Sequence, residues 1–183
     1  MTAFTITVKD EGVQAALKAL SARVNNMAPV LNTIGTDIIT RTRRRFDTST
    51  SPDGTPWAAY PIGGATITML TALLAGSKSN RKKDGNLNAK GTRSLAGKKL
   101  LIDSTHLKTS FHRKSVRDAL IVSSSQQYAA IHQFGGTTSA NSMIPGKKIE
   151  ARPFLPFRKD GTVYPQEQAE ILKAINNYLV QGL

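Results

Sequence analysis

The chain has 183 residues and no cysteine, so one hydrophobic core in a single domain, 1–183, is expected, and disulfides, cysteine nucleophiles and thiolate metal sites are excluded. Lys and Arg number 25 against 12 Asp and Glu, and the formal charge of +13 favours polyanions or acidic protein surfaces as partners. No stretch reaches the roughly 18 apolar residues of a membrane span, and the first residues do not resemble a secretion signal, so no membrane partner is expected.

The first quarter of the sequence predicts one strand and two helices. Residues 4–8 alternate apolar with polar side chains, as in a strand with one face against a core. Apolar residues recur at helical spacing over 11–25, after the capping residue Asp10, and again from Pro29 to about residue 46. We expect this pair of helices to form half of the core. Four arginines near the end of the second helix fit either a solvated helix end or a phosphate site: Arg41, Arg43, Arg44 and Arg45.

A loop rich in proline and glycine follows. Residues 51–64 hold three prolines, three glycines and the only tryptophan, Trp57. This composition predicts a loop that an aromatic side chain pins and that offers a surface to a partner. Residues 66–74 return to helical spacing and predict a short helix that ends at Gly76.

Residues 78–99 carry the strongest charge bias in the chain, with eight basic side chains and one acidic side chain. Gly, Ser and Asn fill most of the remainder, which predicts a mobile basic insertion at about 76–99 that orders on a partner. A solvated loop with no partner is an equally good interpretation, and DNA binding through this loop is the alternative function. The candidate contacts for DNA or an acidic protein are Trp57 and the eight basic residues Lys78, Arg81, Lys82, Lys83, Lys90, Arg93, Lys98 and Lys99.

The next segment predicts short elements. Residues 100–102 indicate a short buried strand, and Ser104-Thr105 can cap a helical turn that holds Leu107. Residues 110–115 and 119–124 predict a β-hairpin with its turn at 114–118.

The stretch YAAIHQFGG, residues 128–136, joins helical spacing to a double glycine. Aromatic and apolar residues three apart predict a buried face that includes Phe134, and Gly135 is expected in the left-handed conformation that ends a helix. His132 is read as structural, because a lone histidine beside core residues is more often hydrogen-bonded than catalytic. The structural residues of this stretch are Tyr128, Ile131, His132, Phe134, Gly135 and Gly136.

The C-terminal part predicts an exposed loop, an extended segment and a helix. Residues 137–148 are small and polar, as in a loop. The segment ARPFLPF, 151–157, cannot be a central strand because its two prolines lack donors, so its aromatic residues should pin it to the core. Its structural residues are Arg152, Pro153 and Phe154, and a turn at Asp160-Gly161 follows. The last helix begins at Pro165 and presents one apolar side: Ile171, Leu172, Ile175, Tyr178 and Leu179.

Motifs of catalysis and cofactor binding are missing from the sequence. GTRSLAGKK, residues 91–99, has five residues between its glycines where a P-loop needs four, and no nucleophile motif occurs. His106, His112 and His132 show no metal-ligand spacing. No catalytic residue, cofactor or metal is therefore predicted, although an enzyme whose histidines converge in the fold is a third interpretation.

Four blocks of the sequence, RRRFDTSTSPDGTPWAAY, LLIDSTHLKTSF, YAAIHQFGG and ARPFLPF, together resemble the virion-morphogenesis and tail-completion family of Mu-like and P2-like tailed phages. The likeness extends from about Ile34 to about Leu179. It implies a small α+β protein in which N-terminal and C-terminal helices pack on a mixed or antiparallel sheet, with long exposed loops.

The resemblance also implies a role. The protein is expected to be a virion protein without enzymatic activity that assembles, in the host cytoplasm, into a homo-oligomeric ring at the head–tail junction. A six-fold ring is expected, acting in tail completion or as a tail terminator so that the tail joins the filled head. The implied partners are further copies of the chain and neighbouring neck, connector and tail proteins, with DNA passing through the neck as another candidate.

Overall fold

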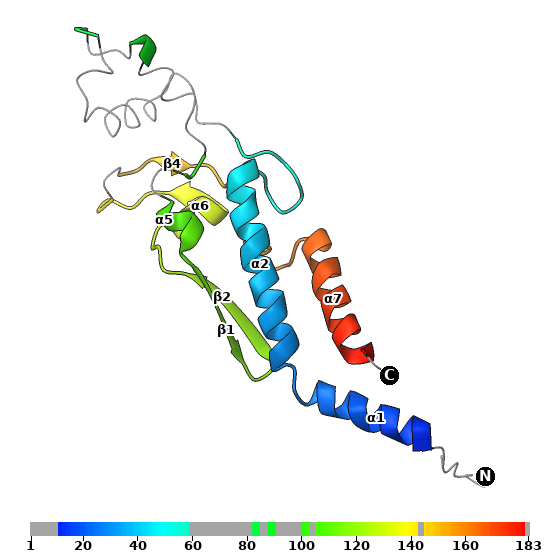
Figure 1. The fold of residues 1–183 in the computed structure, drawn as a ribbon. Coiled ribbons are helices and arrows are strands. Elements are labelled where there is room, and N and C mark those ends of the chain that lie inside the picture. Colours follow the sequence, from blue (N-terminus) through cyan, green and yellow to red (C-terminus); the bar gives the residue numbers. More distant parts are fainter. Residues whose placement is uncertain are drawn as a thin grey trace, which may run out of the picture.

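The structure is a computed structural model, and it describes residues 11–58, 82–84, 88–90, 100–102, 105–142 and 145–181. Helices and two small antiparallel sheets in these ranges confirm the predicted α+β class (Figure 1). The expected strand at 4–8 and the expected helix at 66–74 lie outside the described residues, as does most of the basic insertion.

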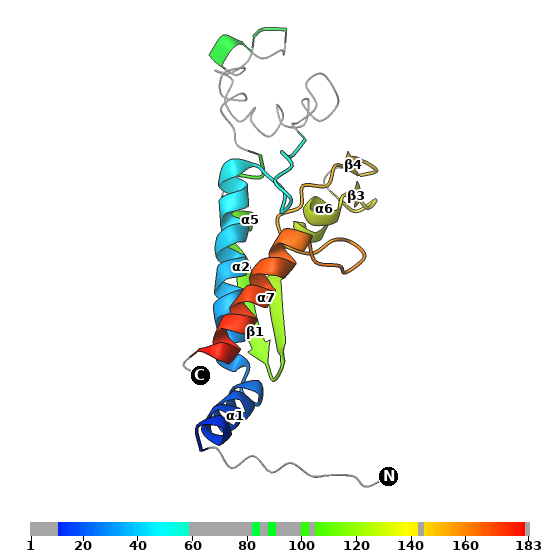
Figure 2. The ribbon, with the colours of Figure 1, turned by 90° about the vertical axis from the view of Figure 1, so that its right-hand side faces the viewer.

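Helix α2 (Ala28–Thr48) is the central helix, on which a β-hairpin and the C-terminal helix pack (Figures 1 and 2). Pro29 lies in its first turn, as predicted, where the missing N–H costs no helical hydrogen bond. Its buried residues repeat every three or four positions along one side, which is the period of a helix with one face in the core. Ser49 ends the helix in the left-handed conformation, and its N–H donates to the Arg45 carbonyl.

A β-hairpin packs against α2. Strands β1 (Phe111–Val116) and β2 (Ala119–Ser124) pair antiparallel along their whole length, which confirms the predicted hairpin. The pairing continues to Val116, so the turn is tighter than expected, and Arg117 adopts the positive φ of 50° that such short turns need. Gly35 of α2 permits the close packing, because a Cβ atom there would lie 2.8 Å from the Leu120 side chain.

Helix α7 (Pro165–Val180) packs beside α2. Its residues Ile171, Ala174, Ile175 and Tyr178 cover the apolar start of α2, which confirms the predicted helix and most of its apolar side. Of the other two predicted residues, Leu179 is half-buried outside this cluster and Leu172 is 57% exposed. Leu172 lies about 100° around the helix from Ile171, outside the stripe that faces α2.

Helix α1 (Glu11–Val24) has nearly the predicted bounds but a different role. None of its residues is buried, and it projects beyond the ends of α2 and α7 (Figures 1 and 2). The expectation that the first two helices form half of the core is therefore wrong. Helix α7 occupies the apolar stripe of α2 instead, and it is α2, not α1, that packs on the hairpin.

The larger core cluster lies near the C-terminal end of α2. Phe46 is at its centre, with ring centroids 5.2 Å from Phe154, 5.5 Å from Trp57 and 6.0 Å from Phe111. Helix α5 (His106–Thr109) adds Leu107, as predicted, although Thr105 makes no side-chain cap. Residues 100–102 pack on this cluster half-buried, but they form a turn, so the strand predicted there is wrong.

Two short elements complete the described fold. Helix α6 (Ala129–Phe134) is followed directly by β3 (Gly136–Thr137), which pairs antiparallel with β4 (Lys148–Ile149). The predicted exposed loop at 137–148 is thus partly an antiparallel arm, and the hydrogen bond from Thr138 N to the Lys147 carbonyl (2.9 Å) extends it.

Candidate functional site

The blocks YAAIHQFGG and ARPFLPF contact each other in the structure. We call this contact, of α6 and the glycines that follow it with the extended segment 151–157, the α6 junction. Gln133, a buried residue of α6, is at its centre. The amide nitrogen of Gln133 donates to the carbonyls of Leu155 (3.3 Å) and Phe157 (2.9 Å). Its amide oxygen accepts from the N–H groups of Phe154 (2.8 Å) and Leu155 (2.9 Å). One side chain therefore satisfies backbone groups that the two prolines keep out of a strand ladder.

The backbone at the end of α6 closes the junction. The N–H of Arg152 donates to the His132 carbonyl at 2.7 Å. Gly135 has φ 69° and ψ 177°, so the expected left-handed helical conformation is wrong, although the positive φ still favours glycine. A Cβ atom at Gly135 would lie 3.0 Å from the Ala151 nitrogen, so glycine also permits the two segments to approach.

The buried face of α6 differs from the predicted one. Ala129 and Gln133, four residues apart, face inward. Tyr128 and Phe134 are exposed, Phe134 by 37%, and Ile131 is half-buried, so the prediction of a buried Phe134 is wrong. The polar side chain of Gln133 holds α6 against the core. The spacing of the apolar residues therefore predicted the wrong buried face for this helix.

Trp57 pins its loop from inside the protein. Its ring meets Phe46 edge-on in the core, and its indole Nε1 donates to the Pro153 carbonyl at 2.9 Å. The predicted pinned loop is confirmed. The expectation that Trp57 itself contacts a partner is corrected, because the ring is buried, and within the described part of the loop, 51–58, the exposed residues are 53–56 and 58.

A buried ion-pair cluster links α2 and α7 to the same segment. Arg45 donates to the Phe154 carbonyl at 2.7 Å and to the Glu167 carboxylate, which Arg41 also contacts through Nε at 3.2 Å. Burial lowers the pKa of Arg45, and the charge of Glu167 acts in the opposite direction. Of the predicted surface arginines, Arg43 and Arg44 are exposed, whereas Arg45 is structural.

His132 is the residue of the junction whose polar group is least satisfied. Its Nδ1 atom is buried and has no hydrogen-bond partner within the described residues. Burial and, to a lesser extent, the positive charge of Arg152 lower the pKa of His132. The Tyr128 ring stands edge-on to it at 5.9 Å. His106 and His112 are exposed on other elements, and the described residues hold no cluster of three metal-ligating side chains.

Arg152 anchors the segment on its other side, since its side chain is buried and Nε donates to the Ala58 carbonyl at 3.1 Å. Gln133, Arg45 and Glu167 were missed as site residues. The signals for them were a glutamine among apolar helical residues, an arginine beside a core phenylalanine, and a glutamate in the first turn of a helix.

Of the basic candidates in the insertion, the structure describes Lys82, Lys83 and Lys90, and all three are exposed. The other basic candidates lie outside the described residues: Lys78, Arg81, Arg93, Lys98 and Lys99. Contact of this insertion with DNA or an acidic protein therefore stays a prediction. No helix in the described ranges has the length and apolar character that crossing a membrane requires.

The α6 junction has a structural role. Its hydrogen bonds hold four segments together: α6, the Trp57 loop, the extended segment and, through Arg45 and Glu167, the α2–α7 pair. What these polar side chains do chemically is fix backbone positions.

Comparisons with known proteins support the family resemblance that the four sequence blocks indicated. The sequence model of the phage virion morphogenesis family matches residues 8–180. The chain is also 36% identical over 78 residues to "Mu-like prophage FluMu G protein 2" of Haemophilus influenzae, a match that covers 43% of this chain and 50% of that protein. The chain thus matches about half the length of that curated relative, and no solved structure matches. Because the family match covers almost the whole chain, the protein belongs to the phage virion morphogenesis family.

Proposed function

We propose that the chain is a structural protein, without enzymatic activity, that forms a homo-oligomeric ring at the head–tail junction of a tailed phage. There it completes or terminates the tail so that the tail joins the filled head. The observation that carries this proposal is the family match over residues 8–180, which includes the α6 junction and both long helices, α2 and α7.

The described structure supports a binding role. The buried polar residues Gln133, Arg45 and Glu167 hold backbone segments, which gives a rigid frame suited to presenting surfaces. The exposed surfaces include apolar side chains: Val116 and Ile121 on the outer face of the hairpin, and Val13, Leu17 and Val24 on α1. Exposed apolar surface of this kind suits contacts with other proteins. A single contact between unlike surfaces, repeated around an axis, is sufficient to build a ring.

A deletion phage tests the proposal. Without the chain, infected cells should accumulate filled heads and separate tails, and supply of the chain from a plasmid should restore joining. Electron microscopy of the lysates and plaque counts are the measurements. Normal joining in the deletion, or a defect in DNA replication in place of joining, would reject the assignment to the neck.

DNA binding is the second candidate function. It is favoured by the charge of +13 and by the exposed lysines Lys82, Lys83 and Lys90. Generic duplex DNA should then bind the purified chain with an affinity that falls steeply with salt, because Lys and Arg displace counterions from phosphates. Replacing the three lysines by glutamine should reduce the salt slope by about three. An unchanged slope would remove them as DNA contacts.

A further inference from the structure

Strand β2 has an open edge. Among the described residues it pairs with β1 alone, so no strand lies along its other side. The Ser125 N–H donates to the Ser110 carbonyl at 3.1 Å, which marks this pair as hydrogen-bonded. Because hydrogen-bonded pairs alternate along an antiparallel ladder, the backbone N–H and C=O groups of Leu120 and Val122 point away from β1. The open edge therefore offers a row of backbone donors and acceptors.

The side chains of β2 leave this edge unprotected. Its sequence, ALIVSS, holds no charged residue and no proline. Leu120 and Val122, which pack toward α2, are only half-buried, and Ile121 on the outer face is 51% exposed. Strand β1 differs, because it carries Arg113 and Lys114, and charged side chains keep an edge from pairing. Proteins cover or protect the edges of sheets, so β2 indicates a strand supplied from outside the described residues.

The sequence holds a matching strand at residues 4–8. The segment reads FTITV, so apolar side chains alternate with threonines, as in a strand with one apolar face. These residues lie outside the described ranges and precede the start of α1 at Glu11. Beside β2, their apolar side chains would continue the row of Leu120 and Val122 on the face that packs toward α2.

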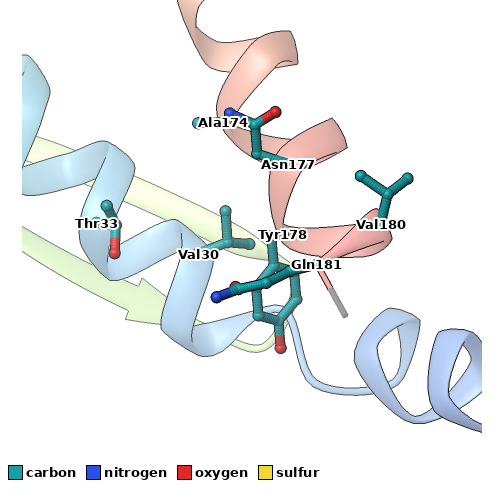
Figure 3. A pocket seen from close by; sticks show the side chains of 7 residues that line it. All are labelled: Val30, Thr33, Ala174, Asn177, Tyr178, Val180 and Gln181. Atoms are coloured by element: carbon teal, nitrogen blue, oxygen red, sulfur yellow. The ribbon is translucent and has the colours of Figure 1, made fainter. Parts of the chain in front are cut away.

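Helix α1 has a fixed direction at the corner where it meets α2 and α7. Arg23 Nη1, near the end of α1, donates to the Leu179 carbonyl of α7 at 2.8 Å. Figure 3 shows Tyr178 of α7 at the same corner, and its hydroxyl donates to the Asn26 carbonyl at 2.7 Å. From this corner α1 points away from the hairpin in both views of the fold (Figures 1 and 2).

This direction places residues 4–8 out of reach of their own β2. The 14 residues of α1 put Glu11 about 21 Å from the corner. The chain from Val8 to Glu11 spans at most about 11 Å, so it does not bring the strand back along α1 to the hairpin. The β2 edge that residues 4–8 reach therefore belongs to another copy.

We infer that residues 4–8 of one copy add as a strand to the open β2 edge of the next copy. Strand addition forms main-chain hydrogen bonds to Leu120 and Val122 and covers their side chains. The strand and the edge are different surfaces of one chain, so the contact is heterologous and leaves a free strand and a free edge for further copies. The inference deepens the proposed function, on which it rests for self-assembly, by assigning an interface between copies.

Photo-crosslinking of the full-length chain tests this contact. Phe4 is replaced by the photoreactive p-benzoylphenylalanine, and this chain is mixed with an unmodified chain that carries heavy nitrogen. Both purified protein and extracts of cells that assemble particles are irradiated. Mass spectrometry then identifies the crosslinked peptides and the chain from which each comes. The expected products join residue 4 of the reactive chain to residues 119–124 of a heavy chain.

Variants within residues 4–8 distinguish strand pairing from non-specific association and leave the described fold untouched. Thr5→Ile combined with Ile6→Thr keeps the composition but breaks the alternation. The yield of the crosslink to residues 119–124 should then fall about tenfold or more, because the apolar side chains no longer share one face. The control, Ile6→Val, keeps the alternation and should leave the yield unchanged.

Variants at the edges give a second measurement. Val122→Pro removes an N–H that points away from β1, so it should lower the crosslink yield while the β1–β2 ladder remains. Arg113→Pro is the matched control, because Arg113 pairs with Val122 and removes the equivalent N–H from the edge of β1. It should not lower the yield. If either proline variant fails to fold, the variants within residues 4–8 decide.

Three crosslinking results would overturn the inference: crosslinks confined to the reactive chain itself, crosslinks to other parts of the heavy chain in place of residues 119–124, or none between chains. Equal yields from Ile6→Val and from the combined Thr5→Ile and Ile6→Thr variant would also overturn it.

The tests of interface and function have separate failures. Absence of the crosslink beside a joining defect in the deletion phage rejects this interface and leaves the proposed function. The crosslink beside normal joining in the deletion rejects the proposed function and leaves the interface.

Discussion

At the scale of single residues, Gln133 accounts for how the two family blocks hold together. Its amide makes four hydrogen bonds to a segment that has two prolines and forms no ladder. Gln133→Leu keeps the approximate size but leaves these backbone groups without partners in a buried place. We expect a loss of about 2–4 kcal/mol in the free energy of unfolding, measured by urea denaturation.

Gln127→Leu is the control for this substitution, because Gln127 is an exposed glutamine six residues earlier. It should change the free energy of unfolding by less than about 0.5 kcal/mol. Equal effects of the two substitutions would show that the hydrogen bonds of Gln133 contribute nothing particular to the junction.

We expect His132 to make the free energy of unfolding depend on pH. Burial and the nearby Arg152 lower its pKa below the ordinary value of 6.5, so the folded protein favours the neutral imidazole. The unfolded chain therefore binds the proton first as the pH falls. This contribution to stability is complete above pH 6.5 and is lost as the pH falls through the lower pKa of the folded state.

The measurement is the free energy of unfolding at pH 7.5 and pH 5.5. The unmodified chain should lose more stability over this interval than a His132→Gln variant. His112→Gln, at an exposed position on the hairpin, should lose as much as the unmodified chain. Identical losses for the unmodified chain and His132→Gln would refute the role of His132.

Sequence reasoning at this scale found aromatic anchors but not polar ones. Phe154 could be predicted as buried and Trp57 as the side chain that pins its loop, because large apolar side chains are stabilised by removal from water wherever the fold permits. The same reasoning placed Phe134 in the core and Trp57 at a partner contact, and both of these predictions are wrong. Gln133 and Arg45 could not be predicted, because a buried polar group is acceptable only where a partner from a distant segment meets it. That partner is fixed by the tertiary structure.

At the scale of elements, the extended segment 151–157 behaves as a core element without being a strand. Phe154 has no exposed surface and packs on Phe46 and Phe111, so Phe154→Ala should cost about 3–5 kcal/mol of unfolding free energy. Phe134→Ala removes the same atoms from a 37% exposed position and should cost less than about 2 kcal/mol. Thermal or urea unfolding of both variants measures the difference, and equal costs would contradict the assignment of the core.

The bounds of helices and of the hairpin were predictable, whereas the partner of each element was not. Periodicity located α1, α2, α7 and the β1–β2 pair within a few residues. It could not tell that α7 rather than α1 covers α2, since both helices carry an apolar stripe. Secondary structure could not be predicted for the short run 100–102, because three apolar residues fit a buried turn as well as a strand.

At the scale of the whole molecule, the sequence was sufficient to predict the family and the α+β class. The four blocks were sufficient to predict the family that the match over 8–180 shows. The arrangement of copies depends on surfaces that meet only between chains, and a single sequence does not reveal their geometry.

We propose that this protein forms a ring where the tail meets the head. Image reconstruction of intact particles whose copies of the chain carry a small fused tag tests this claim most directly. We predict tag density as a closed ring of equivalent copies at the neck, between the filled head and the tail. Tag density at the tail tip or within the head, or mature particles that carry no tag, would contradict the account.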